Sequence, residues 1–216
     1  MTDELLEGIW RAGLILLGSQ VKEQYGLATP IFIDLRHRLY DDVALLRELG
    51  RALHAKIAGL AGGPQAPPQK ILGIPDTATP LALSAAMASL GTSFPLGYAQ
   101  MRKRPAAYPG GASGLSSFMG TFHAGGEITL IDDVMASARS KLWAIEALEK
   151  EGIRVARILV VVDREQGGDQ ILAEKGFPVH RLWTITQILD YFVRTRKVEA
   201  AAARDALDHL HERQYR

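Results

Sequence analysis

The chain has 216 residues, of which 47% are hydrophobic and 23% are charged, which is enough to bury the core of one globular domain. Its formal net charge of +1 gives no large basic field for binding nucleic acid. The lack of cysteine excludes disulfides, thiolate metal sites and a cysteine nucleophile, and it fits a cytoplasmic location. The N-terminus lacks the positive start of a signal peptide, and no apolar run approaches the ~18 residues that span a membrane.

The N-terminal part of the chain predicts a helix, a short strand and a second helix. Apolar residues recur at helical spacing across residues 3–18, and residues 31–35 form the short strand. Asp41 and Asp42 have the side chains of a helix N-cap, so we expect a helix over residues 43–58. On this pattern alone the segment is an ordinary lead-in to a helix.

The next unit is a strand and a helix joined by a short loop. Residues 59–69 are rich in Gly and Pro and are expected to form a surface loop. The strand is predicted at residues 71–74, and residues 81–90 belong to a helix rich in small side chains. Between them, residues 75–79 place backbone amides at a helix start, which suits a phosphate but is equally typical of a plain strand-to-helix loop.

Residues 94–100 predict another short strand, and a long segment over residues 101–120 follows it. This segment is rich in Gly, Pro and Ser, so we expect a mobile loop of the kind that forms lids. It begins with Arg102, Lys103 and Arg104, whose charges suit an anionic pyrophosphate. The alternative is a solvated basic loop.

The most informative stretch is residues 128–141, ITLIDDVMASARSK. It predicts a buried strand, the adjacent carboxylates of Asp132 and Asp133, a loop of small residues, and a helix from about Ser140. Ligands of open α/β sheets lie beyond the carboxyl ends of the strands. Two acids there can hold ribose hydroxyls or a hydrated Mg²⁺, and the loop can present backbone amides to a phosphate. The alternative is a turn whose acids cap the helix and meet water.

The C-terminal third predicts two more strands, each followed by polar residues or a helix. Residues 157–162 are almost wholly apolar, as expected for a parallel strand covered on both faces, and the run DREQGG of residues 163–168 follows. On its own this run is a turn with a surface Asp–Arg pair of little energetic worth. Residues 176–192 predict the last strand and a helix, with His180 at the edge of the core rather than in catalysis. The amphipathic helix over residues 199–213 is expected to be solvated or to pack in a dimer.

Four of these segments resemble motifs of the orotate phosphoribosyltransferases, a type I family that uses phosphoribosyl pyrophosphate (PRPP). ITLIDDVMASARSK resembles the PRPP motif, GIPDTATPLA resembles the pyrophosphate loop GVPxxxxPLA, and TPIFIDLR resembles SPIYIDLR. VVDREQGG is similar to the signature LLDREQGG, which other type I phosphoribosyltransferases do not share. The resemblance extends from about residue 5 to residue 212.

The resemblance implies a doubly wound α/β fold with a mostly parallel sheet. It implies a single domain over residues 1–216, in which residues 1–40 form a small hood over the site and residues 199–216 form a C-terminal helix. It also implies Mg²⁺ on the diphosphate of PRPP and a homodimer in which the mobile loop reaches into the partner's site. The expected ligands are PRPP and orotate, with no nucleic acid and no membrane.

The resemblance also assigns the site residues. Asp132 and Asp133 hold the ribose hydroxyls, and Arg164 holds the orotate carboxylate, with Phe32 of the hood also at the orotate site. The pyrophosphate is held by Arg102, Lys103, Asp76, Thr77, Ala78 and Thr79. The 5′-phosphate is held by Ala136, Ser137, Ala138, Arg139 and Ser140.

The chain departs from the family pattern in three loops. Ala106 stands where the family has its loop lysine, and losing such a contact slows turnover roughly 10²–10³-fold if nothing replaces it. Arg104 and Pro109 replace a glutamate and a glycine of the same loop, and residues 24–27 lack the basic residues of the hood. In the 5′-phosphate loop, Arg139 either covers the phosphate as an extra cation or fills the pocket.

The leading hypothesis is transfer of ribose 5-phosphate from PRPP to orotate, giving orotidine 5′-monophosphate and pyrophosphate in de novo pyrimidine synthesis. The departures support an alternative, a catalytically weak or inactive paralogue that binds PRPP or a nucleotide as a regulator. A third hypothesis keeps catalysis and changes the base, and the retained DREQGG argues against it.

Overall fold

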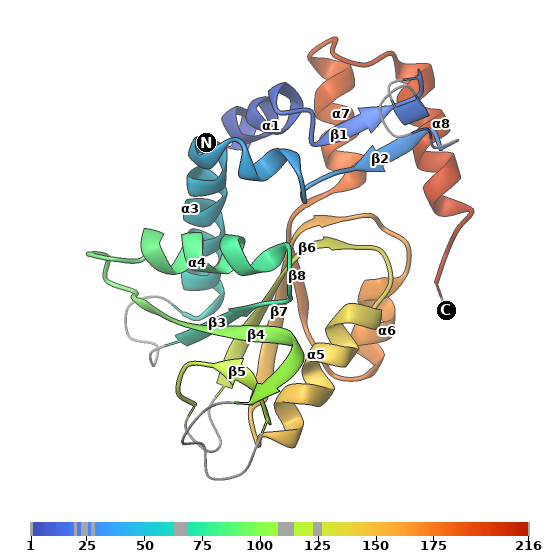
Figure 1. The fold of residues 1–216 in the computed structure, drawn as a ribbon. Helices are drawn as coiled ribbons and strands as arrows, with labels where there is room; N and C mark the ends of the chain where they lie inside the picture. The colour runs from blue at the N-terminus through green and yellow to red at the C-terminus, as the bar shows by residue number, and fades with distance from the viewer. Residues whose placement is uncertain are drawn as a thin grey trace.

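The structure is a computed structural model that describes residues 2–19, 21–22, 26, 29–62, 69–107, 115–122 and 127–215. At residues 2, 103–107 and 115–117 it describes the backbone only. Its centre is a six-stranded sheet of order β5-β4-β3-β6-β7-β8 (Figure 1). Every neighbouring pair is parallel except β4 and β5, which are antiparallel at one edge. The predicted α/β fold with a mostly parallel sheet is therefore confirmed.

The strands of this sheet follow the chain with helices between them. Their bounds are β3 (Gln69–Gly73), β4 (Leu96–Ala107), β5 (Leu115–Met119), β6 (Glu127–Met135), β7 (Arg154–Asp163) and β8 (Val179–Thr184). The central strands are apolar on both faces, since successive side chains point to opposite sides and both sides are covered. In β7, for example, Val160 and Val161 are both buried, and they belong to separate hydrophobic clusters on the two faces.

Helices cover both faces of the sheet (Figure 1). On one face lie α3 (Val43–Leu60) and α4 (Ala78–Ala88), and on the other lie α5 (Arg139–Lys150) and α6 (Gly168–Glu174). The predicted N-cap of α3 is confirmed, because the Asp42 side chain accepts a hydrogen bond of 2.9 Å from the Leu45 amide. None of the described helices is both long and apolar enough to cross a membrane.

The close crossing of α3 and α4 depends on a glycine. A Cβ on Gly50 would lie 2.2 Å from the Ser84 hydroxyl oxygen and 2.6 Å from the Ser84 carbonyl carbon. The Ser84 hydroxyl donates a hydrogen bond of 3.0 Å to the Leu46 carbonyl across the same contact. Consequently α4 packs its small side chains against the core, and its larger Leu83 and Met87 remain exposed.

The hood is a separate two-stranded ribbon. Here β1 (Ile15–Leu17) pairs antiparallel with β2 (Ile31–Ile33), and a 3₁₀ turn over Arg38–Tyr40 leads on to α3. Figure 1 shows the ribbon beside α7 (Ile185–Arg194) and α8 (Ala200–His211).

The predicted helix over residues 3–18 is wrong beyond Arg11, because α1 (Thr2–Arg11) ends seven residues earlier. Gly13 has a φ of +63°. Its amide donates to the Trp10 carbonyl, and the Leu14 amide donates to the Ile9 carbonyl. This pair of bonds ends a helix and suits glycine in the left-handed conformation. The apolar residues beyond it are buried in β1 instead.

The prediction of a loop without structure of its own over residues 101–120 is also wrong for the described part. β4 continues to Ala107, and β5 returns beside it, with Met101 paired to Phe118. Both side chains are buried in the core, which explains why the chain stays extended here. Residues 108–114, which include Tyr108 and Pro109, lie outside the described residues.

Candidate active site

A cleft of about 450 Å³ lies at the carboxyl ends of β3, β6 and β7, where β2 of the hood also contributes to its wall. The cleft brings together predicted site residues from separate parts of the chain. These are Phe32, Thr77, Asp132, Asp133, Ala136, Ser140 and Arg164. Two adjoining hollows of about 640 and 740 Å³ share Pro75 and Asp76 with each other, and Pro75 also lines the cleft.

The two acids lie inside strand β6 rather than after it, because β6 continues to Met135. Asp132 is buried and Asp133 is partly exposed, and both line the cleft. Burial raises the pKa of Asp133 to about 7, and the negative charge of Asp132 adds to this effect. Asp133 therefore titrates near neutral pH.

A buried lysine that the sequence analysis missed lies directly beside Asp132. The Lys141 ammonium is 2.6 Å from Oδ2 of Asp132 and donates a hydrogen bond of 2.8 Å to the Val134 carbonyl. Ser140 Oγ donates to the same Asp132 oxygen at 3.3 Å. The sequence did contain a sign of this buried lysine, because Lys141 lies on the same helical face as Ile145, and that face is buried in the core. A lysine on that face needs an anionic partner, and Asp132 is that partner.

The 5′-phosphate loop leads from β6 into α5. Ala136 and Ser140 line the cleft, whereas Ala138 is buried at the N-cap of α5. Ala138 has φ −74° and ψ −8°, so the backbone at this position does not require glycine. Ser137 is partly buried and does not line the cleft.

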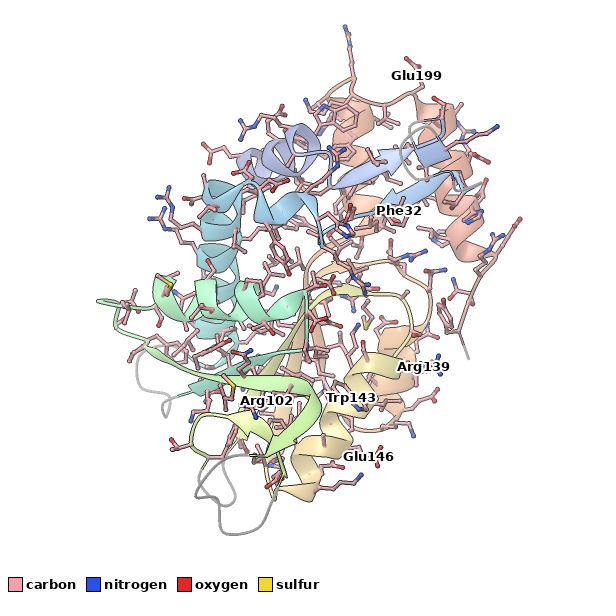
Figure 2. The ribbon with its side chains drawn as sticks, in the orientation of Figure 1. Phe32, Arg102, Arg139, Trp143, Glu146 and Glu199 are labelled. Carbon is pink, nitrogen blue, oxygen red and sulfur yellow. The ribbon has the colours of Figure 1, made fainter. Side chains whose placement is uncertain are left out.

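Arg139 is exposed at the start of α5 and is not among the residues that line the cleft (Figure 2). The hypothesis that it fills the pocket is therefore wrong for this structure. Its charge stays at the rim, beside the loop that would hold a phosphate.

The pyrophosphate loop connects β3 to α4, and its Pro75–Asp76 peptide is cis. The Ala78 amide already donates to the Ile74 carbonyl at 3.2 Å, and the Thr79 amide donates to the Asp76 carbonyl at 3.3 Å. The expectation that all four amides are available thus needs correction for these two. Their bonds close the first turn of α4.

Arg102 extends from β4 towards the same loop. It lines the hollow of about 740 Å³ together with Asp76 and Thr79; Figure 2 shows it at the lower end of the sheet, on β4. The side chains of Lys103 and Ala106 are not among those described.

The DREQGG run forms a loop after β7. The Arg164 amide donates to the Met135 carbonyl at 2.8 Å, and its side chain lines the cleft. Arg164 Nε is buried and has no hydrogen-bond partner among the described residues, and burial lowers the pKa of this guanidinium. The predicted alternative of a surface Asp–Arg pair is wrong, because Asp163 is buried and pairs with Arg181 at 2.9 Å.

This loop and the 5′-phosphate loop touch. A Cβ on Gly168 would lie 2.7 Å from the Ala136 carbonyl oxygen, so only glycine allows the two backbones to approach this closely. Among the described side chains, no three His, Cys, Asp or Glu residues cluster in a way that could hold a metal ion by themselves.

Comparison with known proteins places this cleft in a family. No family model matches the chain. The orotate phosphoribosyltransferase of Thermococcus gammatolerans is 32% identical over 188 residues, which cover 87% of this chain and 92% of that protein. The chain belongs to the orotate phosphoribosyltransferase family. Members of this family are pentosyltransferases, and the chain is therefore placed among these enzymes.

Other relatives agree with this placement. The orotate phosphoribosyltransferase of Thermoplasma acidophilum is 30% identical and covers 85% of this chain and 95% of that protein. The solved UMP synthase of Leishmania donovani matches with a TM-score of 0.75 and 25% identity, over 98% of this chain and 42% of that chain. The structure of the Aeropyrum pernix orotate phosphoribosyltransferase matches with a TM-score of 0.58 and 26% identity, over 88% of this chain and 98% of that chain.

Proposed function

We propose that the chain transfers ribose 5-phosphate from PRPP to orotate, giving orotidine 5′-monophosphate and pyrophosphate in de novo pyrimidine synthesis. The observation that carries this proposal is the single cleft that unites the acids of β6, the 5′-phosphate loop and Arg164. This combination provides groups for a sugar, a phosphate and a carboxylated base within one site.

The reaction requires positioning and charge stabilisation rather than a covalent nucleophile. Pyrophosphate leaves C1 of the ribose with its bonding electron pair, and a ring nitrogen of orotate forms the new bond to C1. Asp132 and Asp133 accept hydrogen bonds from the ribose hydroxyls. The ion pair of Asp132 with Lys141 holds that carboxylate in place.

The 5′-phosphate and the pyrophosphate of PRPP bind at two separate subsites. The 5′-phosphate binds at the loop before α5, where backbone amides and the helix dipole favour an anion. The pyrophosphate binds between the loop of residues 75–79 and the cation of Arg102, which line one hollow. The family resemblance adds Lys103 to this subsite. The guanidinium of Arg164, whose Nε has no hydrogen-bond partner among the described residues, binds the orotate carboxylate, with Phe32 also lining the site.

Mg²⁺ fits this arrangement as an ion carried on the diphosphate. Magnesium is usually bound by substrate phosphates and water with one or two carboxylates rather than by an all-protein cage. Asp76 lies in the loop after β3 and Asp133 lies in β6. Burial raises the pKa of Tyr40 and the charges of Asp133 and Asp76 add to this effect, so both carboxylates lie near its hydroxyl group. The ion would neutralise charge on the departing pyrophosphate.

We also propose that the chain acts as a single domain in the cytoplasm and forms a homodimer through an apolar face of α3 and α4. Val43, Leu83, Met87 and Leu90 are 68%, 44%, 62% and 76% exposed, and they line one hollow of about 500 Å³. Exposed apolar patches of this kind mark interaction sites. The family resemblance implies that in a dimer residues 101–120 reach the partner's site.

The test is formation of orotidine 5′-monophosphate from PRPP, orotate and Mg²⁺ by the wild-type chain and by Arg164→Ala and Arg164→Lys. We expect wild-type turnover and a loss of kcat/KM for orotate of about 100-fold in Arg164→Ala, since a charged hydrogen bond is lost. Arg164→Lys keeps the charge without the planar fork and should recover only part of the loss.

Wild-type protein that forms no product would overturn the proposed transfer. If its melting temperature then rises with PRPP or orotidine monophosphate, the chain is a binding protein of the regulatory kind. Full activity in Arg164→Ala would remove Arg164 from the orotate site.

A further inference from the structure

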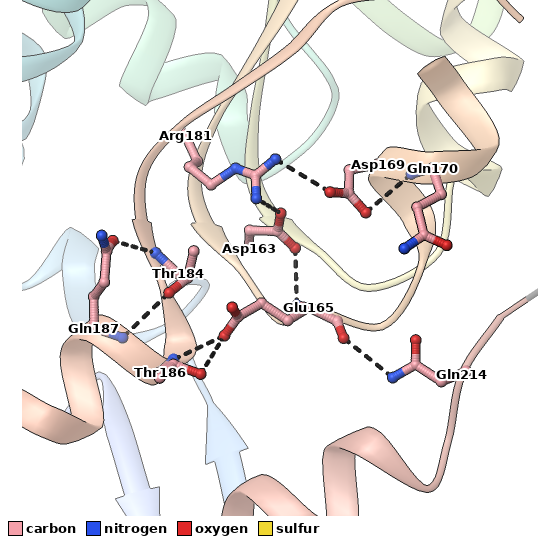
Figure 3. A network of polar contacts seen from close by, with 9 residues as sticks. All are labelled: Asp163, Glu165, Asp169, Gln170, Arg181, Thr184, Thr186, Gln187 and Gln214. Atoms are coloured by element: carbon pink, nitrogen blue, oxygen red, sulfur yellow. Dashed lines mark hydrogen bonds and ion pairs between the residues drawn. The ribbon is translucent and has the colours of Figure 1, made fainter. Parts of the chain in front are cut away.

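The end of the described chain lies against the loop that carries Arg164. We call residues 210–215 the C-terminal segment and residues 163–168 the acceptor loop. Figure 3 shows one contact between them, from Gln214 to Glu165. The two segments are more than 40 residues apart in sequence, so the contact is a tertiary one.

The first part of the contact is centred on Gln166, which is 1% exposed. Its Nε2 donates to the Leu210 carbonyl at 3.2 Å and to the Arg213 carbonyl at 2.9 Å. In return, its own carbonyl accepts a hydrogen bond of 2.9 Å from the Tyr215 amide. Gln166 thereby holds the backbone at the end of α8 and just beyond it.

The second part of the contact is a close approach of the two backbones. Gln214 Nε2 donates to the Glu165 carbonyl at 3.1 Å. Gly167 has a φ of +89°, and a Cβ there would lie 2.6 Å from the Tyr215 carbonyl oxygen. Only glycine fits this position, both in its backbone conformation and in the space that the C-terminal segment leaves.

The opposite side of the acceptor loop is fixed by the sheet and α7 (Figure 3). Asp163 Oδ1 accepts a hydrogen bond of 2.9 Å from the Glu165 amide, and Glu165 Oε2 accepts bonds from the Thr186 amide and hydroxyl at 3.0 and 2.5 Å. Glu165 has a φ of +56°, which is unfavourable for a residue with a Cβ and must be held by its surroundings. The C-terminal segment holds Glu165 from the other side, through the hydrogen bond from Gln214.

Arg164 belongs to the acceptor loop that is held by the C-terminal segment on one side and by the sheet and α7 on the other. Its backbone amide donates to the Met135 carbonyl, whereas its Nε is buried without a hydrogen-bond partner among the described residues. Tyr215 lies close enough to raise the pKa of Arg164, against the larger lowering effect of burial. The direction of the guanidinium therefore depends on where the acceptor loop is held.

We propose that Gln166, Gln214 and Tyr215 are positioning residues for the acceptor base: through the C-terminal segment they hold the acceptor loop so that Arg164 faces the cleft. This rests on the proposed function, because it concerns the base that Arg164 binds. The pyrophosphate hollow is lined by other parts of the chain, so the C-terminal segment should affect orotate more than PRPP.

The test uses the double variant Gln214→Ala/Tyr215→Pro, which removes the side-chain donor to Glu165 and the amide donor to Gln166. The control is His211→Ala, an exposed position in the same segment. KM for orotate, KM for PRPP, kcat and the melting temperature are measured for both and for the wild type.

We expect KM for orotate to rise about tenfold in the double variant, which corresponds to two lost hydrogen bonds. KM for PRPP and kcat should stay within about twofold, and His211→Ala should match the wild type. An unchanged KM for orotate would overturn the inference, as would a parallel worsening of both KM values with a lower melting temperature.

A wild-type chain without turnover would remove the proposed function and would leave this inference testable. The dissociation constant of orotate, measured by calorimetry, then replaces its KM. Binding about tenfold weaker in the double variant supports the positioning role. Equal binding in both proteins, or no binding of orotate to the wild type, overturns it.

Discussion

Lys141 and Asp132 form a buried ion pair at the base of the cleft, with 2.6 Å between Nζ and Oδ2 and side chains that are 2% and 7% exposed. Removing one partner of such a pair leaves a buried charge without compensation. The pair therefore contributes to the stability of the fold and also sets the position of Asp132 in the site.

Lys141→Met should lower the free energy of unfolding by about 3–5 kcal/mol at pH 7, as measured by urea denaturation. The double variant Lys141→Met/Asp132→Asn should recover a large part of this loss, because no buried charge is left unpaired. Lys150→Met is a matched control in the same helix, since Lys150 and its partner Glu146 are both exposed, and it should change stability little. A Lys141→Met protein as stable as the wild type would show that the pair contributes nothing.

The raised pKa of Asp133, about 7, predicts pH dependence in both folding and binding. Below this pKa the folded carboxyl is neutral and above it the carboxyl is charged. Because the folded pKa lies above the ordinary value of 3.8, the stability that Asp133 contributes is complete below about 3.8 and is lost as the pH rises to about 7. Asp133→Asn should remove this loss, so its stability relative to the wild type should increase between pH 4 and pH 7.

PRPP binding should have the opposite pH dependence to stability, since the charged carboxylate of Asp133 is the better acceptor for ribose hydroxyls. We expect the affinity for PRPP to rise through pH 7 and then level off, with protons released on binding below pH 7. Calorimetry in buffers of different ionisation enthalpy measures that release. Equal affinity at pH 6 and pH 8 would contradict the prediction.

Gly73 allows strand β3 to approach the pyrophosphate loop. A Cβ there would lie 2.1 Å from the Ala78 carbonyl oxygen and 2.7 Å from the Thr79 amide nitrogen, so Gly73→Ala must displace the start of α4. We expect KM for PRPP to rise at least about tenfold, together with a lower melting temperature. Gly59→Ala, in α3 with open space around it, should leave KM unchanged and stabilise the helix by up to about 1 kcal/mol.

The apolar face of α3 and α4 can be tested without a change in net charge. Leu83→Glu/Met87→Lys should convert a dimer into a monomer in analytical ultracentrifugation, because charged side chains would be buried at the interface. Gln170→Glu/Ala173→Lys, at exposed positions of α6, is the matched control and should stay dimeric. Two variants with the same sedimentation coefficient as the wild type would place any dimer contact elsewhere.

Local patterns in the sequence were sufficient for much of the fold. The Asp42 N-cap and the apolar run of β7 each depend on residues near one another in the chain. The motifs that resemble the family also indicated which residues lie together, and Asp132 and Arg164 do line one cleft. Where the pattern failed, as in residues 3–18, a glycine with positive φ ended a helix inside an unbroken apolar pattern.

The sequence by itself therefore determined the family, the order of strands and helices, and the loops that form the cleft. Only the tertiary structure decided that Lys141 neutralises Asp132, that β5 pairs with β4, and that Gln166 binds the end of α8. Each of these depends on which side chain meets a partner once the sheet has formed. The periodicity of a sequence indicates which side chains are buried. It does not indicate which charged side chain or backbone group from another segment will contact them.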